Sequence, residues 1–450
     1  MRVFALFFVL LAAYAATLGI RAAPGQRYDD DEAHHLLAAE SIVSDGDADL
    51  SDQYGSRAFS RFYRGVLRPD ALPVDGRLHE PQGVGVAVLV APAYALGGAR
   101  GAEWLMAVLC ALAFTLAALL ARRIVPEPWA SGGAALVGLS APVLAAATTV
   151  GTGPPAALLL AVACLCALRC REHPQRRFAL GGAAAVAALP WLGPALVVPA
   201  LPVAFALVSW TRRRRRALGL VAAEAMLASL IVYVTVNERL YDGVSPVAAR
   251  LGPVPSFPGD YVDRLPNLIA TWLDRAEGLL RWAPALALGF YAGWLLYRSR
   301  RAQLARVTAE RGAAEAAAAL LLAVCAAQLL VVTFWWSGLR GDWFPGAHFV
   351  PALPAAAALV AWGLRHVSRV VAVLLAALTL AGSAWLVGAA RGSGWLAAHT
   401  EAPWGPVARV FPDFVAEPRW AAAVTVAVVA FLAALAVREW RARRALGAAA

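Results

Sequence analysis

The sequence contains no lysine, so all 40 of its basic side chains are arginines. Any contact to a phosphate group must therefore come from arginine, histidine or main-chain amides. Cysteine is also scarce, and all five cysteines lie within or at the end of apolar stretches. That placement indicates small buried side chains rather than a disulfide framework. No loop His or Cys accompanies Cys164 and Cys166, so we predict no metal site there. A glycine-rich phosphate loop, the usual sequence sign of a bound nucleotide, is missing as well.

Polar segments long enough to form a soluble domain are also missing. Hydrophobic residues make up 60% of the 450 positions and the mean hydropathy is +0.62, well above the usual values for soluble domains. Apolar runs of the length that crosses ~30 Å of hydrocarbon recur along the whole chain. The sequence predicts an all-α polytopic membrane protein of about 12–13 transmembrane helices, at 3–20, 82–98, 102–121, 131–149, 153–169, 178–190, 192–209, 217–236, 279–297, 314–334, 347–364, 369–388 and 420–437.

Arginines gather in clusters between the apolar runs. Such clusters mark the cytoplasmic ends of helices, so the net charge of +11 reflects topology and predicts no nucleic-acid partner. The run 3–20 is interpreted as a retained helix rather than a signal peptide, and in both cases 21–81 lies outside. The clusters are at 122–123, 169–177, 212–216, 298–311, 365–369 and 438–444.

The number of crossings before residue 122 stays open at this point. An outer loop ending at 81 and inner arginines at 122 require an odd number of crossings, yet two apolar runs lie between them. Either 82–98 does not fully cross, or the arginines at 122–123 lie outside and 178–209 is one broken helix.

The outer loop 21–81 is unusually acidic. It holds 12 of the 29 acidic residues and only 7 arginines. Its segment 28–35 reads YDDDEAHH, in which Asp31 is placed to cap a short helix that starts at Glu32. Four consecutive carboxylates exceed what a cap needs, and their repulsion favours a raised pKa in one of them, as a general base requires. His79 and Glu80 stand just before the next apolar run. The carboxylate of Glu80 is therefore expected at the same depth relative to the membrane as that of Asp31.

A short amphipathic helix is predicted at 56–67 of the same loop. Phe59, Phe62, Tyr63 and Val66 recur at helical spacing, with arginines on the other face. The pattern is typical of a helix in the membrane interface, and equally of a helix packed on the top of the protein itself. Both interpretations keep the loop close to the bilayer surface.

Five segments form an ordered pattern along the chain: 31–34 (DEAH), 45–50 (DGDADL), 81–98 (PQG to LGG), 274–284 (DRAEGLLRWAP) and 335–349 (WWSG to PGAHF). Taken in this order, they resemble the C-class (GT-C) membrane glycosyltransferases, in the branch of bacterial aminoarabinose transferases and protein O-mannosyltransferases. The resemblance covers residues 1–365. Two positions depart from the family pattern: His348 stands where the family has an arginine, and 151–153 (GTG) replaces an acidic residue at the head of a span.

This resemblance implies a division of the chain and a reaction. Residues 1–365 would form the glycosyltransferase-like core with the outer loop, and 366–450 would add C-terminal transmembrane helices. A sugar would pass from a polyprenyl-phosphate donor to an acceptor hydroxyl on a glycan, lipid or protein, outside the cell membrane. Asp31 would be the general base, with Glu32 and Glu80 as the other catalytic carboxylates. Substrate contacts are expected from Asp30, His34, His79, Arg275, Arg340 and His348.

Other interpretations stay open. A transporter or lipid flippase would carry ionisable residues within its spans and often inverted repeats, but Glu224 is the only clear mid-span acid and no repeat is visible. An inactive membrane scaffold is a further alternative. Asp30, Asp31, Glu32 and His34 are ligand types that suit Ca²⁺ or Mg²⁺, but carboxylate-rich loops attract such ions without needing them. We therefore predict no required cofactor.

Overall fold

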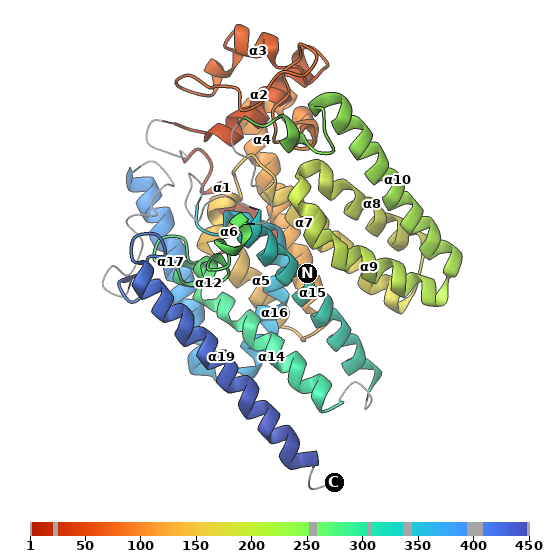
Figure 1. Cartoon of the computed structure of the whole chain (residues 1–450), viewed down its shortest axis with the longest axis vertical. Coiled ribbons are helices and arrows are strands. Elements are labelled where there is room, and N and C mark those ends of the chain that lie inside the picture. The colour runs from red at the N-terminus through yellow and green to blue at the C-terminus, as the bar shows by residue number, and fades with distance from the viewer. Residues whose placement is uncertain are drawn as a thin grey trace.

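The computed structural model describes residues 2–20, 26–251, 259–303, 308–335, 344–393 and 408–447, and within them the chain is all-α (Figure 1). Pairing between extended segments in this part is limited to the isolated bridges Ala71 to Arg250 and Val74 to Arg77. Eight helical segments of the described residues are long and apolar enough to cross a membrane. The chain is therefore a polytopic membrane protein. The eight are α4 (Val84–Ala121), α7 (Gly153–Glu172), η2 with α9 (Pro194–Leu196, Val197–Arg214), α10 with η3 (Arg216–Tyr241, Pro246–Ala249), α15 (Ala309–Phe334), η6 with α16 (Ala347–Ala352, Leu353–His366), α17 (Arg369–Ser393) and α19 (Pro418–Gly447).

The other predicted spans form shorter helices, so the expected count of 12–13 is not reached by this measure. Helices of 10 to 17 residues stand at four predicted spans, below the ~20 residues that a crossing normally needs. These helices are α1 (Arg2–Ala15), α5 (Trp129–Gly138), α8 (Arg176–Leu192) and α14 (Ala287–Arg301); short turns adjoin them at α6 (Ala141–Ala146), α13 (Leu279–Trp282) and η4 (Pro284–Leu286).

Two predicted spans, 82–98 and 102–121, fall within the 38 residues of α4, which consists of two helices joined across a kink. The kink lies at Gly98, whose φ of 60° and ψ of −151° are not helical. A residue without a Cβ adopts this conformation at little cost. The two parts approach closely beside the kink, because a Cβ on Gly101 would lie 2.0 Å from the main-chain oxygen of Ala93.

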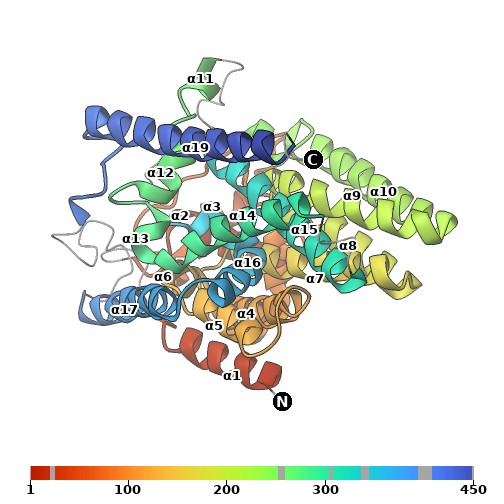
Figure 2. The same ribbon diagram turned by 90° about the horizontal axis from the view of Figure 1, so that it is seen from below.

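The core of the bundle is built from small side chains. Helices α4, α7 and α16 bury alanine along most of their length, and close approach of the backbones follows. Gly133 of α5 shows how close, because a Cβ at this position would lie 2.5 Å from the Cβ of Ala361 in α16. In contrast, only 6% of the apolar window of α19 is buried, and this helix lies at the outside of the bundle (Figure 2).

The described part of the loop predicted to lie outside, residues 26–81, sits over one end of the bundle as a folded cap (Figure 1). It contains α2 (Asp30–Ser44), α3 (Ser51–Gly55) and the turn η1 (Ala58–Arg61), and α2 packs on α4. The helix predicted at 56–67 is reduced to η1. Phe59 and Tyr63 are buried against Leu37 and Leu50 of the cap, whereas Val66 is exposed. Phe59 and Tyr63 of the aromatic stripe therefore pack on the protein itself rather than on lipid. Two further short helices, α11 (Gly259–Val262) and α12 (Asn267–Leu273), precede α13.

Candidate active site

The four consecutive acidic residues at the start of α2 have four different environments. Asp29, not Asp31, is the N-cap: its Oδ1 accepts the Glu32 amide at 2.7 Å, and Glu32 Oε2 accepts the Asp29 amide at 3.1 Å. This reciprocal pair is a capping box. The expectation that Asp31 caps a helix starting at Glu32 is wrong, because the helix begins at Asp30. Asp31 is left exposed, with its carboxylate not used by the helix.

Glu32 joins the outer loop to the bundle. Its side chain is 5% exposed, and Oε1 accepts the amide of Val150 at 2.8 Å, just before α7. Burial raises the pKa of this carboxyl well above its usual value, and the charge of Asp29 adds to the effect. Since both oxygens accept main-chain amides, Glu32 is placed to hold α2 against α7.

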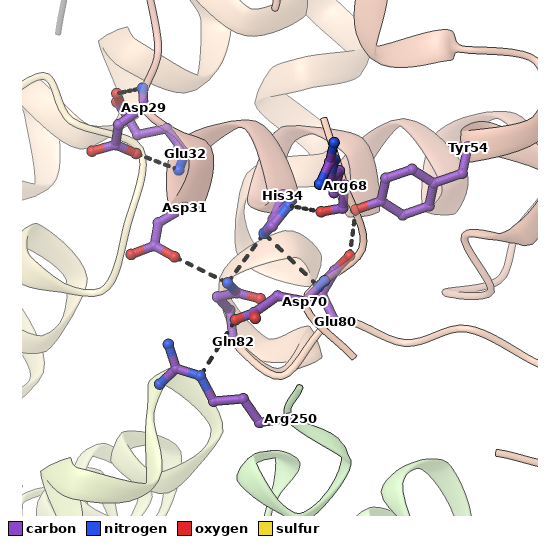
Figure 3. Close-up of polar contacts among 10 residues, drawn as sticks. All are labelled: Asp29, Asp31, Glu32, His34, Tyr54, Arg68, Asp70, Glu80, Gln82 and Arg250. Atoms are coloured by element: carbon purple, nitrogen blue, oxygen red, sulfur yellow. Dashed lines mark hydrogen bonds and ion pairs between the residues drawn. The ribbon is translucent and has the colours of Figure 1, made fainter. Parts of the chain in front are cut away.

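Asp31 belongs to a short chain of hydrogen bonds that also contains Gln82 and His34 (Figure 3). Gln82 Nε2 donates to Asp31 Oδ1 at 3.0 Å and lies 3.2 Å from His34 Nδ1. On the other side of the imidazole ring, Nε2 is 3.2 Å from the main-chain oxygen of Arg68. A carbonyl can only accept, so Nε2 carries the proton and Nδ1 accepts from Gln82.

Glu80 lies beside this chain without joining it. Its Oε2 is 3.8 Å from His34 Nδ1 and accepts the amide of Asp70 at 3.1 Å, while Oε1 accepts the hydroxyl of Tyr54. Burial raises the pKa of the Glu80 carboxyl, and His34 and Tyr54 oppose that change. Glu80 therefore orients the loop around His34 and Asp70.

A cavity of about 270 Å³ opens where the cap meets the bundle. Asp29, Asp31, Glu32 and Asp70 give it an acidic side, and Arg250 is the one arginine among its described lining residues. The remaining wall is largely apolar. It comes from the turn before α7, the segment 192–196, the end of α15 and the start of η6, and includes 151–154, Trp335, Phe344 and Pro351.

Asp70 and Arg250 form an ion pair on the cavity wall, with Arg250 Nε 3.3 Å from Asp70 Oδ2 (Figure 3). Main-chain hydrogen bonds hold the two segments together: the Leu251 amide donates to the Asp70 oxygen at 2.7 Å, and the Leu72 amide donates to the Ala249 oxygen at 2.8 Å. Burial raises the pKa of Asp70, and the guanidinium of Arg250 partly offsets this. Sequence reasoning missed both residues, because no motif links positions 180 residues apart.

Two histidines also reach the cavity. His348, at the start of η6, lines it, and its main-chain oxygen accepts Gln328 Nε2 at 2.7 Å. His35 lines the same cavity from α2, and burial lowers its pKa to about 4. The segment 151–153, which departs from the family pattern, lies on the cavity wall as well. The sequence-predicted Asp31, Glu32 and His348 are thus brought together.

The other predicted residues lie away from the cavity wall. Asp30 accepts the hydroxyl of Tyr63 at 2.5 Å. His79 Nδ1 is 2.7 Å from the main-chain oxygen of Ala48, and its ring packs on Tyr241. Arg275 makes paired hydrogen bonds with Glu417 at 2.9 and 2.7 Å. Arg340 lies outside the described residues.

Within the described part of the chain, no group of three or more His, Cys, Asp or Glu side chains is arranged to hold a metal ion.

No family model matches the chain, and no curated protein does. Among solved structures, the fold is similar to that of ArnT from Cupriavidus metallidurans in the apo state. The TM-score is 0.48 and the identity 16%, over 88% of this chain and 74% of that one. It is also similar to the archaeal oligosaccharyltransferase AglB from Archaeoglobus fulgidus, in complex with an inhibitory peptide and a dolichol-phosphate. Here the TM-score is 0.46 and the identity 13%, over 86% of this chain and 56% of that one. Because both likenesses are distant, we base the functional assignment on the side chains of this chain.

Proposed function

We propose that the protein is a membrane glycosyltransferase that moves a hexosyl or pentosyl group from a polyprenyl-phosphate donor to an acceptor hydroxyl. One observation carries the proposal: an exposed carboxylate, Asp31, and a guanidinium, Arg250, line the same largely apolar cavity at the end of a membrane bundle. A general base and a cation for a leaving phosphate are the two charged groups that this transfer needs. The apolar wall suits a donor that approaches through the lipid.

In the proposed reaction, the acceptor hydroxyl gives its proton to Asp31 while its oxygen bonds to the anomeric carbon of the sugar. The bond between that carbon and the phosphate oxygen breaks, and polyprenyl phosphate leaves with the electron pair. Arg250 pairs with the leaving phosphate, since a charge-assisted contact from arginine is among the strongest available to an oxyanion. His348 and the main-chain amides at 151–153 border the same space.

The remaining predicted residues receive supporting roles in this proposal. Glu32 fixes α2 to the bundle, and Glu80 orients the loop through Tyr54 and the Asp70 amide. Arg275 pairs with Glu417 and does not line the cavity, whereas Arg250 does, so we transfer the expected phosphate contact to Arg250. Asp30, His34 and His79 shape the loop through the hydrogen bonds described above.

The alternative of a transporter has less support. Glu224, the mid-span acid, is exposed on α10 rather than enclosed in the bundle, whereas ionisable residues of a transport pathway normally face its interior.

Transfer assays in washed membranes test the proposal. A panel of radiolabelled polyprenyl-phosphate sugars should include at least one whose label reaches an endogenous acceptor, and Asp31→Asn membranes with equal protein content should not transfer it. Nucleotide sugars serve as the control donors. If no polyprenyl donor is used, or if a nucleotide sugar alone is used, the proposal is wrong.

The outer position of the cap is part of the same proposal. Ser51 is exposed on α3 and Arg213 is exposed at the end of α9. A cysteine at Ser51 should react with an impermeant maleimide in intact cells, and one at Arg213 only after permeabilisation. The opposite pattern would invert the topology.

A further inference from the structure

We propose that Gln82 is the positioning residue for Asp31, and that it determines which carboxylate oxygen meets the acceptor hydroxyl. The inference rests on the proposed function and assigns a role to a residue that the sequence placed only at the start of the predicted span 82–98. Gln82 lies on the cavity wall two residues before α4, which begins at Val84.

The amide of Gln82 has one orientation that satisfies its neighbours. Nε2 has two hydrogens, one directed to Asp31 Oδ1 at 3.0 Å and the other to His34 Nδ1 at 3.2 Å. His34 can accept because its own proton is on Nε2, opposite the Arg68 carbonyl at 3.2 Å. The reverse orientation would place the amide oxygen of Gln82 against the carboxylate, where two acceptors repel.

His34 thus acts on Asp31 only through Gln82. Hydrogen donation diverges from the Gln82 amide: one hydrogen goes to the Asp31 carboxylate and the other to the His34 ring, which donates in turn to the Arg68 oxygen (Figure 3). Gln82 Oε1 is buried and has no hydrogen-bond partner among the described residues. No other contact therefore competes for the orientation of this amide.

The consequence for Asp31 is an asymmetric carboxylate. Oδ1 accepts from Gln82, while no described residue donates to Oδ2, which is left for a hydroxyl in the cavity. One oxygen of Asp31 is therefore fixed by Gln82 and the other is open to the cavity.

The test measures protonation of Asp31 without depending on any sugar donor. Carbodiimide reacts with the protonated carboxyl, so the pH midpoint of Asp31 labelling, followed by peptide mass spectrometry on the full chain in membranes, reports its proton affinity. Gln82→Met keeps the length of the side chain and removes both donors. We expect the midpoint to rise by about 0.5–1 pH unit, the scale of one lost hydrogen bond to a carboxylate.

Gln53→Met is the matched control. Gln53 also donates to an aspartate of the cap, Asp45, so the same substitution there should leave the Asp31 midpoint unchanged. Should Gln82→Met fail to accumulate, Gln82→Asn replaces it: this side chain stays polar but is one methylene too short to reach Asp31, and the midpoint should again rise. An unchanged midpoint in the Gln82 variant that accumulates overturns the inference.

The transfer assay separates this inference from the proposed function. With an active donor, the acidic limb of the rate profile should move with the labelling midpoint in Gln82→Met, whereas a merely structural role would lower the rate equally at every pH. A shifted midpoint without transfer by the wild type leaves the positioning role standing and removes the glycosyltransferase. If transfer depends on Asp31 but Gln82→Met does not shift the labelling midpoint, the proposed function stands and the positioning role of Gln82 is wrong.

Discussion

Replacing Asp31 by Asn should abolish transfer while leaving the fold almost unchanged. The Asn side-chain oxygen can still accept from Gln82 Nε2, now 3.0 Å from Asp31 Oδ1. The substitution therefore exchanges a charge-assisted hydrogen bond for a neutral one, which costs about 1 kcal/mol of stability or less at this exposed position. The lost general base costs a factor of about 10²–10⁴ in rate, or roughly 2.7–5.5 kcal/mol in the barrier. Activity should fall far more than stability.

The measurement is an initial transfer rate per mole of membrane-inserted protein, with the melting temperature of the same preparation. Asp29→Asn is the matched control, because Asn caps helices as well as Asp does, and its rate should stay within about threefold of the wild type. Glu80→Gln should be intermediate, since water can replace part of its orienting role. A rate for Asp31→Asn within tenfold of the wild type would refute the assignment. If Asp30→Asn loses transfer and Asp31→Asn does not, the general base is Asp30 rather than Asp31.

Three further outcomes follow from the geometry. Arg250→Gln should raise KM for the donor by about tenfold or more, because a hydrogen bond to a charged group contributes ~1.5–3 kcal/mol. The control Arg68→Gln should leave KM unchanged. Equal KM values for Arg250→Gln and the wild type would show that Arg250 does not bind the phosphate. The pKa of buried His35 is lowered to about 4. The contribution of neutral His35 to the free energy of unfolding is therefore present above the pKa of the unfolded chain, about 6.5, and is lost as pH falls towards 4. Melting curves of the wild type should show this loss, and those of His35→Leu should show less of it. Phe59→Ser should destabilise the cap by roughly 3–5 kcal/mol without changing KM. Limited proteolysis measures the destabilisation, with Val66→Ser as the control at an exposed site. A change in KM without destabilisation would indicate that Phe59 contacts lipid instead.

The apolar runs predicted the helices well because membrane helices depend on local composition and length. The glycines at 97–98 separated the predicted runs 82–98 and 102–121 correctly, since the helical geometry is interrupted at Gly98. The sequence could not separate α8 or α14 from full crossings, because apolar composition continues after the last residue of α8 and before the first residue of α14.

At the site, residue types were predictable and their register was not. Any of the carboxylates at 29–31 can cap a helix, so local rules leave the choice open. The choice is made by distant contacts: the Tyr28 hydroxyl donates to Glu103 at 2.7 Å and Arg27 pairs with the same carboxylate at 2.9 Å. These contacts anchor the chain just before the helix. Asp70 and Arg250 depend on the same kind of long-range packing.

The ion pair between Arg27 and Glu103 also sets a height for the site. Glu103 stands 18 residues before Ala121, the last residue of α4, which is about 27 Å along a helix axis and close to the ~30 Å thickness of the hydrocarbon layer. One turn of chain beyond Arg27, the helix α2 begins. In a bilayer of this thickness, the carboxylates of the cavity would stand at the depth of the lipid headgroups. The donor of the proposed reaction, a phosphate on a polyprenyl chain, would lie at that depth without leaving its leaflet and would reach the cavity by lateral diffusion alone.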